Sequence, residues 1–347
     1  MDFTDLIDLA AERAGGAALL ANDEFFAAKD NLLKSTAPEW REGVYTERGK
    51  WMDGWETRRR RTPGYDWCIV RLGIPGIVRG VVVDTTFFRG NYPESCSVDA
   101  CAVDGTPDPA TLIDDTLGTS WAEIVPRSPL KGDAKNLFPV QHDARVTHVR
   151  LNIFPDGGVA RLRVHGQGCL DRRLLDAASE IDLAAAEHGG FIPVCSDMFF
   201  GHRNNLIMPG RSTHMGDGWE TKRRRGEGHD WTVVRLAARG TLHRVEVDTD
   251  HFKGNAPGSC MVETCDDAGA TVEALADPAR EWRVLLPQTP LQPHARHRFV
   301  ELAHWAPATH ARLNIYPDGG IARLRLFGRL NVSEPEVPSL SPRAEAV

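Results

Sequence analysis

The stretch THVRLNIFPDGGVARLRVHG (147–166) alternates apolar and polar residues on both sides of a glycine-rich turn. Val149, Leu151 and Ile153 fall on one face of an extended chain, and Leu162 continues the pattern after the turn. A period of two residues is typical of a half-buried β-strand. Asp-Gly-Gly tolerates the positive φ angles of a tight turn. The stretch therefore predicts two strands joined by a hairpin.

The same stretch returns as THARLNIYPDGGIARLRLFG (309–328), and most of the first half of the chain returns with it in the same order. The further matches are NDEFFAAKDNLL (22–33) with SDMFFGHRNNLI (196–207), DGWETRRRRTPGYDWCIVRL (53–72) with DGWETKRRRGEGHDWTVVRL (217–236), and VVVDTTFFRGNYPESC (81–96) with VEVDTDHFKGNAPGSC (245–260). A repeat of this length is a whole domain, not a unit of a solenoid. We expect two domains, at residues 1–170 and 193–330.

Short strand-like runs fill each repeat, for example CIVRL (68–72) and RGVVVDT (79–85), with glycine and proline between them. Many short strands with frequent turns predict an all-β fold, with one β-sandwich or jelly roll per repeat.

The residues between the repeats have a helical spacing of apolar side chains that ends at Gly189 and Gly190. We expect a helix over 171–188 within a short linker at 171–192. The last residues, 331–347, are rich in proline, serine and glutamate, which predicts a disordered tail.

The composition of the 347 residues is that of a globular protein, with 41% hydrophobic and 26% charged residues. The net charge of −7 argues against a general attraction for nucleic acid. We find no secretory signal and no apolar run of ~18–20 residues, the length of a membrane span. Seven cysteines scattered over the chain favour the reducing cytoplasm over a secreted disulfide framework.

The repeated phrases DGWETRRRR, GYDW and VDTTFFRGNYPESC, closed by RLNIFPDGG and ARLR, resemble the allantoicase family over roughly residues 20–330. The resemblance implies two tandem jelly-roll domains similar to galactose-binding modules. It implies hydrolysis of allantoate to ureidoglycolate and urea in purine degradation. It also implies a homo-oligomer and no cofactor.

Allantoate is a small carboxylate whose central carbon carries two ureido groups, so its site needs a cation, a general acid and a general base. Arginine binds a carboxylate through two parallel hydrogen bonds, and Asp, Glu and Asn complement ureido groups. The repeated polar segments contain this mixture. Our catalytic candidates are Glu94, Asp53 and Glu56, and our substrate-binding candidates are Arg58, Arg61, Asp66, Arg89, Asn91 and His251.

Each of these segments also has a purely structural interpretation. Residues 53–61 could form a salt-bridged, solvated edge strand. Asp66 could pair with the neighbouring arginines, and Asn91 could serve only the turn that follows Gly90. The sequence leaves these alternatives open.

The two repeats differ at the positions that matter most for this chemistry. Glu94 corresponds to Gly258, and Arg89 corresponds to Lys253, which lacks the guanidinium fork. We expect the first repeat to keep the site. The second would act as a scaffold, or would contribute His251 to a shared site.

We expect no metal, because the thirteen histidines do not form a repeated ligand spacing with carboxylates. Asp248, Asp250 and His251 remain the one arrangement that could bind a metal. The alternatives to an allantoate hydrolase are a tandem jelly-roll protein that binds a small ligand or carbohydrate without catalysis, and an enzyme for a related ureide such as ureidoglycolate.

Overall fold

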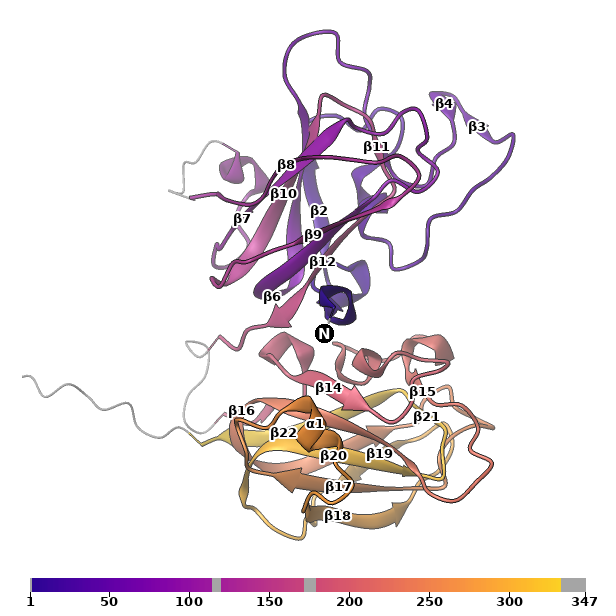
Figure 1. Ribbon diagram of the computed structural model, residues 1–347, viewed down its shortest axis with the longest axis vertical. Helices are drawn as coiled ribbons and strands as arrows, with labels where there is room; N and C mark the ends of the chain where they lie inside the picture. The colour runs from indigo at the N-terminus through magenta and orange to yellow at the C-terminus, as the bar shows by residue number, and fades with distance from the viewer. Residues whose placement is uncertain (1, 114–119, 172–178, 332–347) are drawn as a thin grey trace, which may run out of the picture. The chain divides into compact units, whose positions relative to one another are not determined.

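The computed structural model describes residues 2–113, 120–171 and 179–331, and these form two compact units. The first contains Met1–Leu170, Ala185–Phe191 and Asn204–Arg211; the second contains Asp171–Ala184, Ile192–Arg203 and Ser212–Val347. Each unit is a jelly-roll β-sandwich, as the sequence predicts (Figure 1). None of the helices in the described parts of the chain has the length and hydropathy of a membrane span.

One long strand organises the first unit. Strand β6 (Asp66–Asp84) pairs through its first half with β2 (Ala17–Ala21) and β10 (Val146–Phe154). Its second half pairs with β9 (Lys135–Pro139) and β12 (Arg161–Gly168). The sequence predicts two separate strands here. A single strand that passes from one group of partners to the other joins them into one hydrogen-bonded network.

The other strands of the first unit extend this network on both sides. The order is β1-β12-β6-β10-β7-β8, with all pairs antiparallel. These strands are β1 (Ile7–Asp8), β7 (Ser95–Cys101) and β8 (Ala122–Pro129). Two small sheets lie outside the network: β3 (Tyr45–Thr46) with β4 (Gly49–Lys50), and β5 (Trp55–Glu56) with β11 (Gly158–Val159).

Strands β10 and β12 are not partners, so the predicted hairpin between them is wrong. They pair with opposite halves of β6, and the Pro155–Ala160 connection crosses between the two groups of strands. Gly157 has φ 141°, and a Cβ there would lie 2.7 Å from the backbone nitrogen of Pro93. The glycines therefore serve a close approach of two loops. The Gly158 amide donates to the Asn91 carbonyl at 2.7 Å, which ties the connection to the loop before β7.

The second unit repeats this topology in the order β13-β22-β16-β20-β17-β18, with β14 and β19 also paired to the long strand β16. Its strands are β13 (Ile181–Asp182), β14 (Phe191–Cys195), β15 (Trp219–Glu220), β16 (Asp230–Asp248), β17 (Ser259–Cys265), β18 (Arg283–Pro290), β19 (Arg296–Phe299), β20 (Pro307–Tyr316), β21 (Gly320–Ile321) and β22 (Arg323–Leu330). In the described parts of the chain the α-helical residues are Val272–Ala276 (α1).

The alternating apolar residues form the core of each sandwich. Val149, Leu151 and Ile153 of β10 are fully buried, and so is Trp55 of β5. The Trp55 indole donates to the Asp23 carbonyl at 2.8 Å, and Trp219 donates to Asp197 at the same distance in the second unit. Burying an aromatic side chain of this size stabilises a fold by about 2–3 kcal/mol.

The helix predicted over 171–188 is wrong where the structure can be compared with it. Residues 172–178 lie outside the described residues, as do residues 332–347 of the predicted tail. Ile181–Asp182 form strand β13, and Ala186–His188 form a single 3-10 turn that ends at Gly189. The apolar residues of this segment are buried without forming a helix: Leu183, Ala184 and Ala185, between β13 and the 3-10 turn, are all buried.

The first repeat has extra residues between two matched aspartates. Asp23 matches Asp197, which lies 174 positions further along the chain, whereas Asp53 matches Asp217, which lies 164 positions further. The first repeat is therefore ten residues longer in this interval. The extra length falls within 41–52, which we call the insert and which contains the β3–β4 hairpin.

Candidate functional site

The loops at one end of the first sandwich enclose a cavity of about 1060 Å³, which we call the main compartment. The segments that meet there follow β5, precede β7 and follow β10. The lining residues are Phe26, Glu56, Thr57, Arg58, Arg59, Arg60, Arg61, Gly90, Asn91, Tyr92, Glu94, Leu130, Pro155, Asp156 and Gly157. Loops at the end of a sandwich are a common place for function because the strands below them hold them rigidly.

The arginine run divides into two pairs with different surroundings. The Arg58 guanidinium lies 2.6 Å from the Asp23 carboxylate, and the Arg60 guanidinium lies 2.6 Å from Asp66. Arg59 and Arg61 have no carboxylate partner among the residues that the structure describes. Both line the main compartment, so they can bind an anionic ligand there.

Glu56 is an acid of the main compartment whose surroundings shift its pKa. Burial raises the pKa of its carboxyl group, although the hydrogen bond from the Asn91 amide to Oε1, at 2.8 Å, acts in the opposite direction. Strand β5 positions Glu56, because Glu56 pairs with Gly158 of β11 and its backbone bonds to Ala27. A carboxyl group with a raised pKa in a cavity is suited to donate a proton.

Glu94 lies on the opposite loop of the same compartment. Its side chain is exposed, and the backbone at this position is fixed on both sides. The Glu94 amide donates to the Phe154 carbonyl at 3.0 Å, and its own carbonyl accepts from Leu130 at 3.0 Å. The main compartment thus contains the carboxyl groups of Glu56 and Glu94 together with the guanidinium groups of the arginine run. A third carboxylate, from Asp156, also lines it and accepts the Arg60 backbone amide at 2.8 Å.

A second cavity of about 430 Å³, the side compartment, adjoins the main compartment. It is lined by Phe26, Trp40, Lys50, Met52, Glu56, Phe87, Arg89, Gly90 and Asn91. Four of these residues also line the main compartment: Phe26, Glu56, Gly90 and Asn91. The two compartments therefore meet at the Glu56–Asn91 hydrogen bond.

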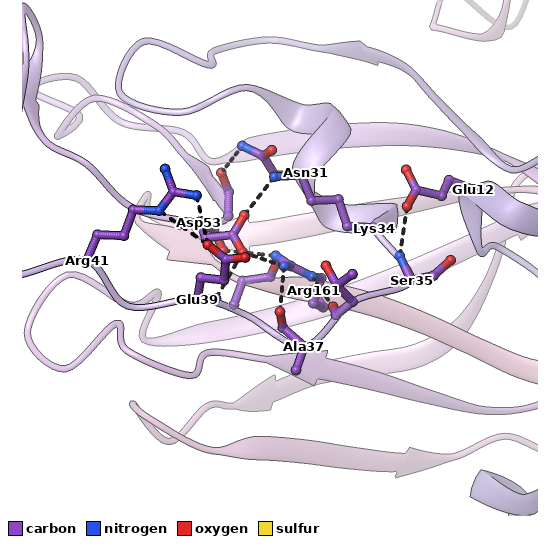
Figure 2. A network of polar contacts seen from close by, with 12 residues as sticks. Glu12, Asn31, Lys34, Ser35, Ala37, Glu39, Arg41, Asp53 and Arg161 are labelled. Carbon is purple, nitrogen blue, oxygen red and sulfur yellow. Dashed lines mark hydrogen bonds and ion pairs between the residues drawn. The ribbon is translucent and has the colours of Figure 1, made fainter. Parts of the chain in front are cut away.

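Asp53 lies outside both compartments, in a buried polar network (Figure 2). Its carboxylate lies 2.6 Å from the Arg161 guanidinium and 2.8 Å from the Lys34 ammonium, and it accepts the Glu39 amide at 3.0 Å. Burial opposes ionisation of Asp53, but these hydrogen bonds outweigh it and hold the pKa of the carboxyl group below its ordinary value. The network joins β12 to the segment before the insert.

The other predicted binding residues divide between the compartments and the framework. Asp66 is buried and accepts hydrogen bonds from Arg60 and from the Asn22 amide, so it does not line the main compartment. Arg89 lines the side compartment, where its guanidinium lies 3.0 Å from the exposed Asp133 carboxylate. Asn91 lines both compartments.

His251 belongs to the second unit. Its Nε2 lies 3.1 Å from the Ser212 carbonyl, and its backbone amide donates to Nδ1 of His294 at 2.9 Å. The Asp250 carboxylate lies 2.9 Å from the same His294 nitrogen. Across the described ranges, no group of three or more His, Cys, Asp or Glu side chains has the arrangement of a metal site.

Comparison with known proteins identifies the family. A family model described as the allantoicase repeat matches residues 7–169 and again residues 181–331. The chain belongs to the allantoicase family. A probable allantoicase of Photobacterium profundum is 46% identical over 330 residues, covering 94% of this chain and 98% of the relative. The allantoicase of Dictyostelium discoideum is 45% identical over 326 residues, covering 93% and 87%.

The solved allantoicase structures also have this fold. A crystal structure of allantoicase from Saccharomyces cerevisiae aligns with a TM-score of 0.77 at 33% identity, covering 93% of this chain and 92% of that chain. The model of the allantoicase repeat matches the chain twice, which confirms the internal duplication predicted from the sequence.

Three residues of this allantoicase-family chain line the compartments with chemically useful side chains, although they are not among the candidates proposed from the sequence: Arg59, Trp40 and Lys50. Arg59 lines the main compartment and has no acidic partner among the described residues. Trp40 and Lys50 lie next to and within the insert, which has no counterpart in the other repeat. The ten-residue difference in length is the signal that could have identified them.

Proposed function

We propose that the main compartment is where this allantoicase-family hydrolase converts allantoate and water to ureidoglycolate and urea. Urea leaves with its carbonyl carbon, so the bond that breaks joins the central carbon of allantoate to a ureido nitrogen. The oxygen of water becomes the hydroxyl group of ureidoglycolate, and one of its protons ends on the departing urea. The observation that supports this site is the meeting of the Glu56 and Glu94 carboxyl groups with the guanidinium groups of Arg59 and Arg61, which have no acidic partner in the described chain, in one cavity.

Arg59 and Arg61 bind the carboxylate of allantoate in this proposal. Guanidinium groups form two parallel hydrogen bonds to a carboxylate, and neither of these two is engaged by an acid of the described chain. Arg58 contributes positive charge at the rim while it remains paired with Asp23.

Glu56 acts as the general acid and Glu94 as the general base. Glu56 is the candidate whose pKa is raised by burial, so it can deliver a proton to the departing nitrogen. Glu94 is exposed and faces solvent from which water enters. Asn91 directs its amide toward Glu56 and so leaves its carbonyl oxygen to accept a ureido N–H.

Asp53 and Asp66 serve the framework in this proposal, because each carboxylate is buried and paired with an arginine. Arg89 binds substrate from the side compartment. His251 takes no part in the site of the first repeat, whose acid comes from strand β5 and whose base comes from the loop before β7.

The test is urea release from allantoate by the purified protein, with ureidoglycolate as a rival substrate. We expect urea from allantoate, at a rate well above that from ureidoglycolate. We expect Glu56→Gln and Glu94→Gln each to lower kcat at least ~10²-fold, the usual contribution of a positioned acid or base. Normal kcat in both variants would show that the chemistry occurs elsewhere.

We also propose that the enzyme works in the cytoplasm as a homo-oligomer. The seven cysteines, all free, support a reducing compartment. The exposed Phe199 and Phe200 of the second unit support association through that unit. Light scattering of the purified protein would test this, and a monomer at micromolar concentration would contradict it.

A further inference from the structure

The side compartment differs in character from the main compartment. Its walls are aromatic: the Trp40 and Phe87 rings lie 5.7 Å apart between centroids, and Phe26 lines the boundary with the main compartment. Its cations are Lys50 and Arg89. The Lys50 ammonium lies 3.9 Å from the centre of the Trp40 ring and has no carboxylate partner among the residues that the structure describes.

The insert completes this compartment and is attached to its aromatic wall. Gly49, with φ 141°, lies against Phe26, where a Cβ would come within 3.4 Å of the ring. The Arg48 guanidinium donates to the Phe25 carbonyl at 3.0 Å. These contacts hold Lys50, the next residue, beside Trp40. The second repeat lacks the insert and has His214 at the position of Trp40.

The structure of allantoate explains why its enzyme needs a second compartment. Its two ureido arms are identical, yet only one leaves as urea, so the site must hold one arm apart from the acid and base. A ureido group is flat, which suits packing between aromatic rings. Its carbonyl accepts hydrogen bonds and its N–H groups donate them, which matches the Lys50 ammonium on one side and the Asn91 side-chain carbonyl on the other.

We propose that the side compartment binds the ureido arm that stays on ureidoglycolate, and that Lys50 is the specificity-determining residue that holds its carbonyl. The inference rests on the proposed function. The departing arm and the carboxylate occupy the larger main compartment, which contains Glu94 and the two unpaired arginines of the described chain. Glu56 stands at the junction, within reach of the bond between the central carbon and the departing nitrogen.

The experiment measures inhibition of allantoate hydrolysis by each product in Lys50→Met and Trp40→Leu. Ureidoglycolate keeps the retained arm, and urea is the departed arm. Loss of a hydrogen bond from a charged donor weakens binding about tenfold or more. We therefore expect the Ki of ureidoglycolate and the KM of allantoate to rise about tenfold in Lys50→Met. Both should also rise in Trp40→Leu, which removes the aromatic wall against the flat arm, while the Ki of urea stays unchanged in both variants. Tyr45→Ala is the matched control, because Tyr45 lies on the same hairpin, is 70% exposed and lines neither compartment.

The outcomes separate this inference from the function on which it rests. If the wild-type protein releases no urea from allantoate, both the proposed function and the assignment of the side compartment are wrong. If it does, but the two variants bind ureidoglycolate normally, only the assignment of the side compartment falls. A rise in the Ki of urea alone would place the departing arm there and would overturn the proposal. Thermal unfolding of each variant checks that the insert still folds.

Discussion

At the scale of single residues, the arginine run shows how a repeated charge pattern can serve two purposes. Arg58 and Arg60 each lie 2.6 Å from an aspartate, and they hold the loop against the rest of the sandwich. All four arginines line the main compartment, but Arg59 and Arg61 have no acidic partner among the described residues. Pairing with an acid therefore distinguishes Arg58 and Arg60 from the two arginines that the proposed function assigns to substrate binding.

The first prediction concerns these unpaired arginines. Arg59→Met or Arg61→Met should raise the KM of allantoate about 10- to 100-fold, since a charge-assisted hydrogen bond contributes roughly 1.5–3 kcal/mol. The matched control is Arg223→Met, the same position in the second repeat, which should leave steady-state kinetics unchanged. Equal effects at Arg59 and Arg223 would contradict the assignment of the site to the first repeat.

The second prediction follows from the raised pKa of Glu56. A general acid must be protonated, so kcat should fall as pH rises through the pKa of this group. Glu56→Gln should abolish that high-pH limb as well as lower kcat. Glu220→Gln, at the corresponding position of the second unit, should keep the wild-type profile. A pH–rate profile of Glu56→Gln with the high-pH limb intact would assign the acid to another residue.

At the scale of elements, the buried pair between Asp53 and Arg161 joins strand β12 to the loop before β5. The second unit repeats this with Asp217 and Arg323, whose side chains lie 3.0 Å apart. Alternation assigns Arg161 to the polar face of its strand, but this residue is 1% exposed. Alternation predicts which face a residue occupies, and does not show that a second layer covers that face.

The third prediction is that Asp53→Asn destabilises the first unit by about 3–5 kcal/mol, because it leaves the Arg161 charge buried without its partner. Guanidinium unfolding followed by fluorescence would measure this, with Asp217→Asn as the corresponding change in the second unit. The lowered pKa of Asp53 means that this stabilisation is present above the ordinary pKa of aspartate and is lost as pH falls through the lowered value. A loss of activity without any loss of stability would return Asp53 to the catalytic candidates.

At the scale of the whole molecule, the two repeats share a framework but differ at residues to which the proposed function assigns chemistry. The Glu56–Asn91 hydrogen bond recurs as Glu220–Asn255, at 2.6 Å. Glu94 is replaced by Gly258, which removes the second carboxylate. Duplication can keep the scaffold and lose the chemistry, because packing and catalysis depend on different side chains.

The fourth prediction is therefore one site per chain. Titration calorimetry with an unreactive allantoate analogue should give a stoichiometry of one, and Arg59→Met should weaken this binding about 10- to 100-fold. Two equal sites per chain would contradict the inequivalence of the repeats. Binding that is unchanged in Arg59→Met but weakened in Arg223→Met would place the site in the second unit.

The sequence by itself determined the duplication, the all-β class and the family, because these depend on local alternation and on long motifs that can be read directly. It also proposed Glu56, Glu94 and Asn91, which all line the main compartment. Tertiary structure decided which strands pair, as the absent hairpin between β10 and β12 shows. It also decided that Asp53 and Asp66 are paired with arginines, whereas Arg59 and Lys50 have no acidic partner in the described chain. Strand pairs and ion pairs join residues that are far apart in the chain, so the local spacing of residues cannot predict them.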